Sequence, residues 1–137
     1  MTDTIQLRVQ TADRLVIDCP VTEAEIPGED GYLGILPGHI PLITELAIGE
    51  LSYVCNGRRE CLAIARGIAQ VRSGQVTIFA RVAERAMDID VARAQQDRLR
   101  AEERLRQCSS NTDFAHAMSA LAWADAQLGV VAIMAGK

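Results

Sequence analysis

The chain has 137 residues, of which 49% are hydrophobic and 23% charged, and its formal net charge is −4. This length suits one domain, or one small domain with an appendage, and the hydrophobic content excludes a globally disordered chain. A negative net charge argues against a nucleic-acid surface, which needs an excess of Lys and Arg on one face. We therefore expect a folded protein with no nucleic-acid partner.

The use of cysteine and histidine argues against a metal site. Four cysteines occur without a Cys-x-x-Cys pair, and the chain has only two histidines, so an ordinary zinc-ligand spacing is absent. Cys55 and Cys61 flank the turn-like Asn56-Gly57 and are expected to be reduced neighbours across a hairpin. No signal peptide begins the sequence, and no uninterrupted apolar stretch approaches the roughly 20 residues that span a bilayer. We expect a soluble, intracellular protein without direct membrane insertion.

Residues 4–85 predict a series of short strands. Apolar and polar residues alternate over residues 4–11, which is the pattern of a half-buried strand. Turn signals such as Asn56-Gly57 divide this part of the chain into about ten strands. Ile48-Gly49 and Arg66-Gly67 are two of the expected breaks. Many short strands at such spacing are typical of an antiparallel β-sandwich or barrel.

The stretch from Asp30 to Thr44 is apolar but interrupted by three glycines and two prolines. Its segment Leu36-Pro37-Gly38-His39 fits a type II turn, because Pro37 presets φ at the first central position and Gly38 tolerates positive φ at the second. Local chemistry leaves two interpretations open: a hairpin of the core, or a rigid loop that presents a partner-binding surface.

The composition changes at Ala86, since no Gly or Pro occurs from there until Gly129 and good helix formers dominate. A first helix is expected to start at Asp88 or Asp90, where a carboxylate favours a helix N-terminus, and to run to about Gln107. Its apolar stripe is thin and is interrupted by Arg98. The stripe consists of Val91, Ala94, Ala101, Leu105 and Cys108.

A second helix is expected to be capped by Thr112 or Asp113 and to end at Gly129. Its apolar stripe consists of Phe114, Ala117, Met118, Leu121, Ala124 and Leu128. Two Ala-rich helices joined by a short loop indicate an antiparallel hairpin, which we expect to be weakly docked and mobile.

Arginines at positions 93, 100 and 104 share one face of the first helix. Such a row is usually a solvated face, and the alternative is a cationic strip for an acidic partner or a phosphate. No common catalytic motif accompanies it: the phosphate loop, the dinucleotide fingerprint and the Gly-x-Ser-x-Gly elbow are all absent. We therefore do not expect an enzyme, and a small enzyme with an unrecognised site is a minor alternative.

Two motifs carry a family resemblance. Gly31 to Leu42, Gly-Tyr-Leu-Gly-Ile-Leu-Pro-Gly-His-Ile-Pro-Leu, closely resembles the signature of the epsilon subunit of bacterial rotary ATP synthases, the delta subunit of mitochondria. Ala83 to Ala94 resembles the family's second landmark, the Ile/Leu-Asp-x-x-Arg-Ala motif. The resemblance implies a β-sandwich docking domain at residues 1–86 and a helical hairpin regulatory domain at residues 87–137.

The resemblance also implies a function. In this family the sandwich binds the gamma subunit and the c-ring of a proton-translocating ATP synthase, and the hairpin can extend toward the beta subunit and inhibit ATP hydrolysis. It implies a non-catalytic, peripheral subunit at the cytoplasmic face of the bacterial inner membrane, without a required cofactor. The alternative interpretation is a free-standing β-sandwich binding module with a helical tail.

Several residues occupy family contact positions. Thr11, His39 and Thr44 resemble positions that face gamma, and Tyr32 resembles a c-ring-facing position where relatives commonly carry Glu. Some bacterial relatives bind ATP in the hairpin, and the residues matching that site are Glu84, Ile89, Asp90, Arg93, Ala94 and Arg100. Two arginines of such relatives are replaced here by Trp123 and Gln127. We therefore expect ATP to be at most a weak regulatory ligand, because two charge-assisted hydrogen bonds of about 1.5–3 kcal/mol each are lost.

Overall fold

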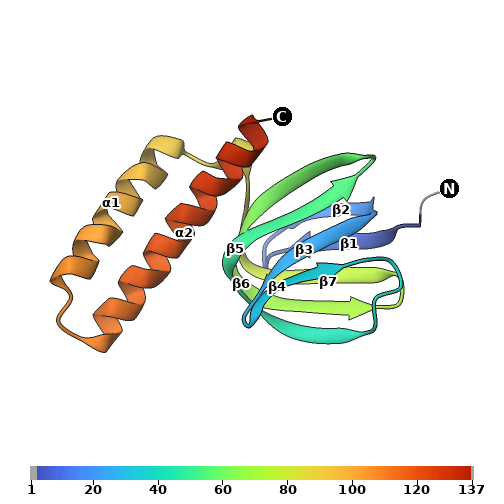
Figure 1. The fold of residues 1–137 in the computed structure, drawn as a ribbon, viewed down its shortest axis with the longest axis horizontal. Coiled ribbons are helices and arrows are strands. Elements are labelled where there is room, and N and C mark those ends of the chain that lie inside the picture. Colours follow the sequence, from blue (N-terminus) through green and yellow to red (C-terminus); the bar gives the residue numbers. More distant parts are fainter. Residues whose placement is uncertain (1–2, 137) are drawn as a thin grey trace.

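A computed structural model describes residues 3–136 of the chain. The first part forms one curled sheet, and the second forms a helical hairpin at one end of it (Figure 1). The strands are β1 (Ile5–Gln10), β2 (Leu15–Val21), β3 (Glu23–Gly28), β4 (Gly31–Ile35), β5 (Leu42–Cys55), β6 (Arg58–Arg72) and β7 (Gln75–Arg85). A 3-10 turn, η1 (Ala86–Asp88), leads to the helices α1 (Val91–Gln107) and α2 (Asn111–Ala135).

All seven strands belong to one sheet, in the order β2-β1-β7-β6-β5-β3-β4. Neighbouring strands are antiparallel except β1 and β7, which are parallel. The sheet curls until β2, at one edge, contacts β5 four places away, so that two layers enclose one core. The largest fully buried side chains are Ile5, Leu7, Ile26, Ile35, Leu46, Leu51, Leu62, Ile64 and Ile78. The expected sandwich followed by a two-helix hairpin is confirmed.

The number of strands is seven rather than about ten, because β5 and β6 run through two of the expected breaks. At Arg66 (φ 57°) and Gly67 (φ 131°) the chain of β6 bends but continues. A side chain at Gly67 would collide with the carbonyl oxygen of Phe79 on β7, so the glycine permits close strand approach. The glycine that suggested a turn is therefore a bend within a long strand.

The Pro37-Gly38 turn is confirmed. The amide of His39 donates to the carbonyl of Leu36 at 3.0 Å, and Gly38 has φ 84°. Both features are those of a type II turn, in which the second central residue needs positive φ. The turn joins β4 to β5 and holds Ile40 at 76% exposure, so this apolar loop lies on the surface rather than in the core.

The helix ends are only partly as expected. Asp90 caps α1, because its Oδ1 accepts the amide of Arg93 at 3.1 Å. Ser110, not Thr112 or Asp113, caps α2, because its Oγ accepts the amide of Asp113 at 3.1 Å. Gly129 does not end α2, which continues to Ala135.

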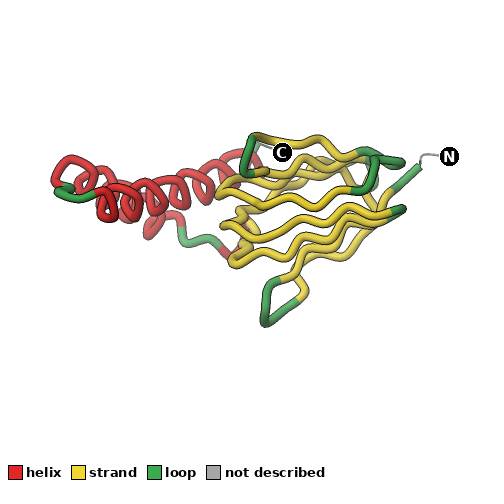
Figure 2. Tube along the Cα trace, turned by 90° about the horizontal axis from the view of Figure 1, so that it is seen from below, coloured by secondary structure: helices red, strands yellow, loops and turns green. Residues whose placement is uncertain are grey.

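The two helices pack on each other through alanines, with Ala94 and Ala101 of α1 and Ala117 and Ala124 of α2 buried. Arg98, which interrupts the stripe of α1 in the sequence, reaches across the hairpin and its Nε lies 2.7 Å from Asp125 Oδ1. Figure 2 shows that the far half of the hairpin projects beyond the strands. The main contacts with the sheet are made by α2.

Among the described residues, α2 is the one helix long and apolar enough to cross a membrane by length and composition alone, with a hydropathy of 1.4 over its most apolar window. Its apolar run is not continuous in the sequence, because Ser119, Asp125 and Gln127 interrupt it. In this structure one side of α2 packs on α1 and another on β5 and β6.

Candidate functional site

The hairpin lies on the outer face of β5, β6 and β7, on a surface that we call the hairpin dock. Strand register places Glu50, Ala63 and Glu84 in one row across these strands. The buried cluster between α2 and this face consists of Cys61, Ala63, Ile89, Ala126 and Val130, with Ile48, Ala86, Trp123, Val131 and Met134 packed around it. The strands contribute mainly small side chains here, so α2 comes close while burying little apolar area.

Polar contacts surround this small apolar cluster. Gln127 Nε2 donates to Glu84 Oε1 at 2.6 Å, and Arg66 Nη2 donates to Ser119 Oγ at 3.0 Å. The Cys61 thiol donates to the carbonyl of Val130 at 3.9 Å. These contacts join α2 to β6 and β7. The Gln127 and Arg66 bonds lie at half-buried or exposed positions, where a hydrogen bond contributes only modestly to stability, and the buried Cys61 contact is a long, weak thiol bond.

Glu50 contacts α2 where the helix has no side chain. Its Oε1 occupies the place of a Cβ at Gly129, which explains why this helix carries a glycine in its interior. Burial raises the pKa of Glu50 above its ordinary value. The docked hairpin therefore disfavours the ionised form of this carboxyl.

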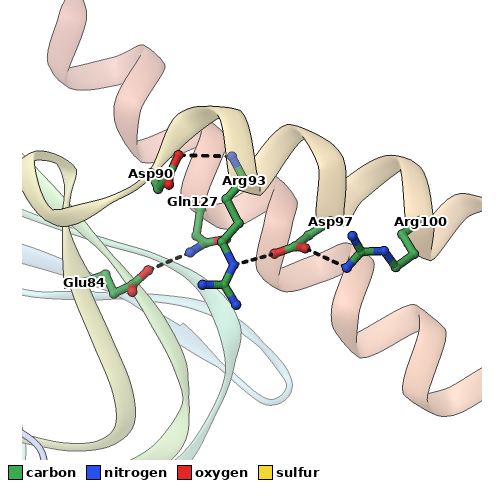
Figure 3. Close-up of polar contacts among 6 residues, drawn as sticks. All are labelled: Glu84, Asp90, Arg93, Asp97, Arg100 and Gln127. Carbon is green, nitrogen blue, oxygen red and sulfur yellow. Dashed lines mark hydrogen bonds and ion pairs between the residues drawn. The ribbon is translucent and has the colours of Figure 1, made fainter.

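A cavity of about 310 Å³ opens where the end of β7, the start of α1 and α2 meet. Its lining residues are Glu84, Asp88, Asp90, Arg93, Ala94, Asp97, Trp123 and Gln127. Four of the six residues proposed for ATP line it, namely Glu84, Asp90, Arg93 and Ala94. Ile89 is instead buried in the hairpin dock, and Arg100 lies further along α1 (Figure 3).

The charges of this cavity are mostly negative, since four carboxylates and one guanidinium line it. The side chain of Arg93 lies 3.9 Å from Asp97, which also accepts a hydrogen bond from Arg100 at 3.3 Å (Figure 3). Gln127 already bonds Glu84. Both arginines are therefore paired with Asp97 within α1, and of the two only Arg93 lines the cavity.

The proposed gamma and c-ring residues do not form a single cluster. Thr11 follows β1 and its hydroxyl donates to Asp13 at 2.6 Å, a bond that lowers the pKa of Asp13. His39 lies in the type II turn, with Nδ1 2.7 Å from the carbonyl oxygen of Ile40. Thr44 is half-buried on β5. Within residues 3–136, no hydrogen bond joins any two of Thr11, Tyr32, His39 and Thr44.

Tyr32 turns toward the hairpin side of β5. The residue is 55% exposed, and its hydroxyl oxygen accepts a hydrogen bond from the amide of Glu50 at 3.1 Å. A side chain at Gly49 would collide with this hydroxyl and with Pro27, so the glycine makes room for the tyrosine. The hydroxyl of Tyr32 is thus held next to Glu50, one of the two carboxylate residues of the hairpin dock.

The other half of the long strands carries an exposed apolar surface that the sequence pattern did not reveal. Ile43, Ile68 and Phe79, which we call the outer patch, are 70%, 47% and 45% exposed. Ile68 pairs directly with Phe79, and Ile43 lies two positions from the residue paired with Ile68. The available signal was Phe79 itself, a large aromatic residue on the otherwise polar face of an alternating strand.

In the turn before β5, Leu36 and Ile40 are also exposed. Single exposed apolar residues need no explanation, but a contiguous group on one face marks an interaction surface. The hairpin leaves this surface of the sandwich uncovered.

Comparison with known families and proteins gives a consistent result. The beta-sandwich domain of the ATP synthase Delta/Epsilon chain matches residues 4–86, and the long alpha-helix domain of the same chain matches residues 87–132. An ATP synthase epsilon chain of Koribacter versatilis is 53% identical over 106 residues, covering 77% of this chain and 75% of that one. An ATP synthase epsilon chain of Nitratidesulfovibrio vulgaris (strain DP4) is 41% identical over 130 residues, covering 95% and 97%.

Solved structures show the same fold. A chain in the cryo-EM structure of the Euglena gracilis mitochondrial ATP synthase, which includes OSCP, F1 and the c-ring, aligns with a TM-score of 0.81. That chain is 23% identical, and the alignment covers 94% of this chain and 81% of that one. A chain from the central stalk and c-ring structure of Tetrahymena thermophila aligns with a TM-score of 0.64 at 9% identity, covering 95% and 98%.

Proposed function

Because the chain belongs to the family of ATP synthase delta/epsilon chains, subunits that are not themselves catalytic, we propose that it works in the central stalk of a proton-translocating rotary ATP synthase. There it couples the gamma subunit to the c-ring, at the cytoplasmic face of the bacterial inner membrane and peripheral to the bilayer. The observation that carries this proposal is the outer patch, an uncovered apolar face on the domain that must be held by partners.

The outer patch is the proposed site for gamma. Large apolar side chains on a rigid, paired part of the sheet give a partner area to bury without ordering a flexible segment. His39 lies in the turn that leads into this face, and Thr44 lies on β5 next to Ile43 but faces the other side of the sheet. With Thr11 they complete the proposed gamma contacts. Tyr32 is the proposed c-ring contact, made by its exposed ring because its hydroxyl is already bonded to Glu50.

Co-purification with a gamma subunit tests this assignment. The chain should form a stable complex with gamma, and the double substitution Ile43→Asp with Phe79→Asp should abolish it. Leu99→Asp provides a matched control, since Leu99 is 66% exposed on α1, away from the outer patch. If the wild-type chain does not co-purify with gamma, the result would support the alternative, a free-standing binding module.

We also propose that the hairpin regulates ATP hydrolysis by leaving the hairpin dock and extending along gamma toward the beta subunit. The small apolar cluster and half-buried polar contacts of the dock support a hairpin that can be released at modest cost. Truncation after residue 87 should then raise hydrolysis by the membrane-bound enzyme. If hydrolysis is unchanged under all conditions, the proposed inhibitory role of the hairpin is wrong, and the proposed coupling role is unaffected.

ATP is at most a weak ligand of the cavity at the base of the hairpin, and the protein requires no cofactor. Four carboxylates repel a polyphosphate, and Trp123 and Gln127 supply no positive charge. Calorimetry with the isolated chain should show no binding at micromolar ATP. Replacing both residues, Trp123→Arg with Gln127→Arg, should raise the affinity, whereas micromolar binding to the wild-type chain would overturn the proposal.

A further inference from the structure

Two cysteines on opposite layers of the sandwich face the same interior space. On β2, Cys19 alternates with Ile17 and Val21, both buried in the core. On β5, Cys55 is two positions beyond the buried Tyr53 and so points to the same side. Both cysteines are half-buried and pack at the edge of the core.

The two cysteines lie together where β2 and β5 contact each other, since both pack at the edge of the core and line the same cavity. This is not the pair suggested by the sequence. Cys61 lies on the opposite face of the sheet from Cys55, in the cluster beneath α2, so the expected Cys55–Cys61 neighbours are separated by the sheet itself. Cys19 and Cys55 lie on β2 and β5, which are four places apart in the sheet order and come together where the curled sheet closes.

Small molecules can reach this pair. Cys19 and Cys55 line a cavity of about 350 Å³ that also includes Asn56 and Arg58, both exposed at the β5–β6 turn. The remaining lining residues are Val16, Ile17, Asp18, Tyr53, Glu60 and Arg85. The thiols therefore lie at the inner end of an open pocket, not sealed within the core.

We propose that Cys19 and Cys55 form a reversible oxidation site that closes to a disulfide and joins the two layers of the sandwich. The oxidant is a small disulfide such as oxidised glutathione. A thiolate of the pair attacks it, forms a mixed disulfide and releases one small thiol. The second protein thiol then displaces the other small thiol, so two protein S–H bonds are replaced by one S–S bond and two small thiols leave.

The surroundings make this reaction slow at neutral pH. Burial, together with the neighbouring Cys55 thiol, raises the pKa of Cys19 to about 11. Asp18 and Glu60 add to this effect with their negative charges. The thiolate is the reactive form, so attack by Cys19 is slow at neutral pH and becomes faster at higher pH.

Closing the bond should stabilise the sandwich. Cys19 and Cys55 are far apart in the chain, and a cross-link between them restricts the unfolded chain more than the folded one. The hairpin dock and the outer patch lie on outer faces of the sheet, whereas the thiols face inward. Oxidation is therefore expected to raise the melting temperature without displacing the hairpin.

The test uses the full chain incubated with oxidised glutathione at pH 7 and pH 8, followed by thiol blocking and non-reducing peptide mass spectrometry. A Cys19–Cys55 peptide should form, faster by roughly tenfold at the higher pH. The double variant Cys61→Ser with Cys108→Ser keeps both reacting thiols and should form the same bond with a raised melting temperature. Cys55→Ser should leave only mixed disulfides.

Two results would overturn the proposal. One is a double variant, folded by circular dichroism, that gives mixed disulfides alone. The other is a wild-type disulfide that maps to Cys61 or Cys108, whose thiols donate to the carbonyls of Val130 and Leu105 in this structure.

Discussion

The outer faces of β5, β6 and β7 differ between their two halves. One half, the hairpin dock, is covered by α2 yet offers small residues and two carboxylates, in the row Glu50, Ala63 and Glu84. The other half, the outer patch, is bare yet offers Ile43, Ile68 and Phe79. Burial of large apolar side chains stabilises a contact more than burial of alanine. The hairpin is therefore bound weakly to the sandwich, and the surface with the larger apolar side chains remains free to bind a partner.

The largest expected effect comes from breaking the outer patch. Ile43→Asp with Phe79→Asp places two charges in the proposed gamma interface, and each truncated anchor of this kind typically costs about 2 kcal/mol or more. Affinity for gamma should fall by at least about 100-fold in a titration, with the fold unchanged by circular dichroism. An affinity within threefold of wild type would show that gamma binds elsewhere.

The next effect comes from overfilling the hairpin dock. Ala63 is fully buried beneath α2, so Ala63→Leu should weaken docking by about 1–3 kcal/mol. Limited proteolysis within α1 and α2 should then accelerate several-fold while the strands stay protected. Ala92→Leu, on the exposed side of α1, is the matched control. Equal protection in both variants would contradict close docking at Ala63.

A smaller effect is expected at the hydrogen bond between Gln127 and Glu84, which we call the latch. Gln127→Ala removes the 2.6 Å hydrogen bond, so the half-buried Glu84 carboxylate loses this donor. The free energy of hairpin docking should weaken by about 1 kcal/mol. Amide exchange in the C-terminal half of α2 should increase about fivefold, whereas Gln96→Ala on α1 should change nothing. No increase would show that the latch contributes nothing to docking.

The smallest effect is a dependence of docking on pH. Burial raises the pKa of Glu50 above 4.5 in the docked state, so that state binds more protons than the undocked state between the two pKa values. Docking of the hairpin should strengthen as pH falls through this window. Above the raised pKa, the free-energy cost of burying the ionised Glu50 carboxylate does not change with pH. The groups facing Glu50 are the Tyr32 hydroxyl and the backbone at Gly129, with Glu84 across Ala63.

Glu50→Gln should remove this dependence, because the amide does not titrate. The check is hairpin protection against proteolysis from pH 5 to pH 8, measured with a protease active across the range. A wild-type profile that matches the Glu50→Gln profile would assign the pH response to another group.

The sequence predicted those features that depend on local backbone chemistry. The Leu36–His39 turn follows from Pro37 and Gly38, and the start of α1 follows from the Asp90 cap. The signature at Gly31 to Leu42 and the Asp90 motif identified the family, which in turn suggested the cavity residues. These interactions join positions close in the chain, so a short stretch of sequence is enough to specify them.

Features that depend on distant contacts could not be predicted from the sequence. Gly67 allows β6 to come close to β7, and Gly129 makes room for the side chain of Glu50. In the sequence, the first glycine predicts the end of a strand and the second the end of a helix. Cys55 lies beside Cys19 rather than Cys61, because the sheet curls and because strand register puts Cys61 on the other face. Such roles follow from how the sheet closes, which local patterns do not encode.

Native-state hydrogen exchange of the full chain in low denaturant most directly tests whether the hairpin is held more weakly than the sandwich. Amides of α1 and α2 should exchange through a partial opening whose free energy lies below that of global unfolding, while amides of β5 and β6 should report global unfolding. If helices and strands instead exchange with the same free energy and the same denaturant dependence, the hairpin and the sandwich unfold as one unit. That result would contradict a releasable hairpin.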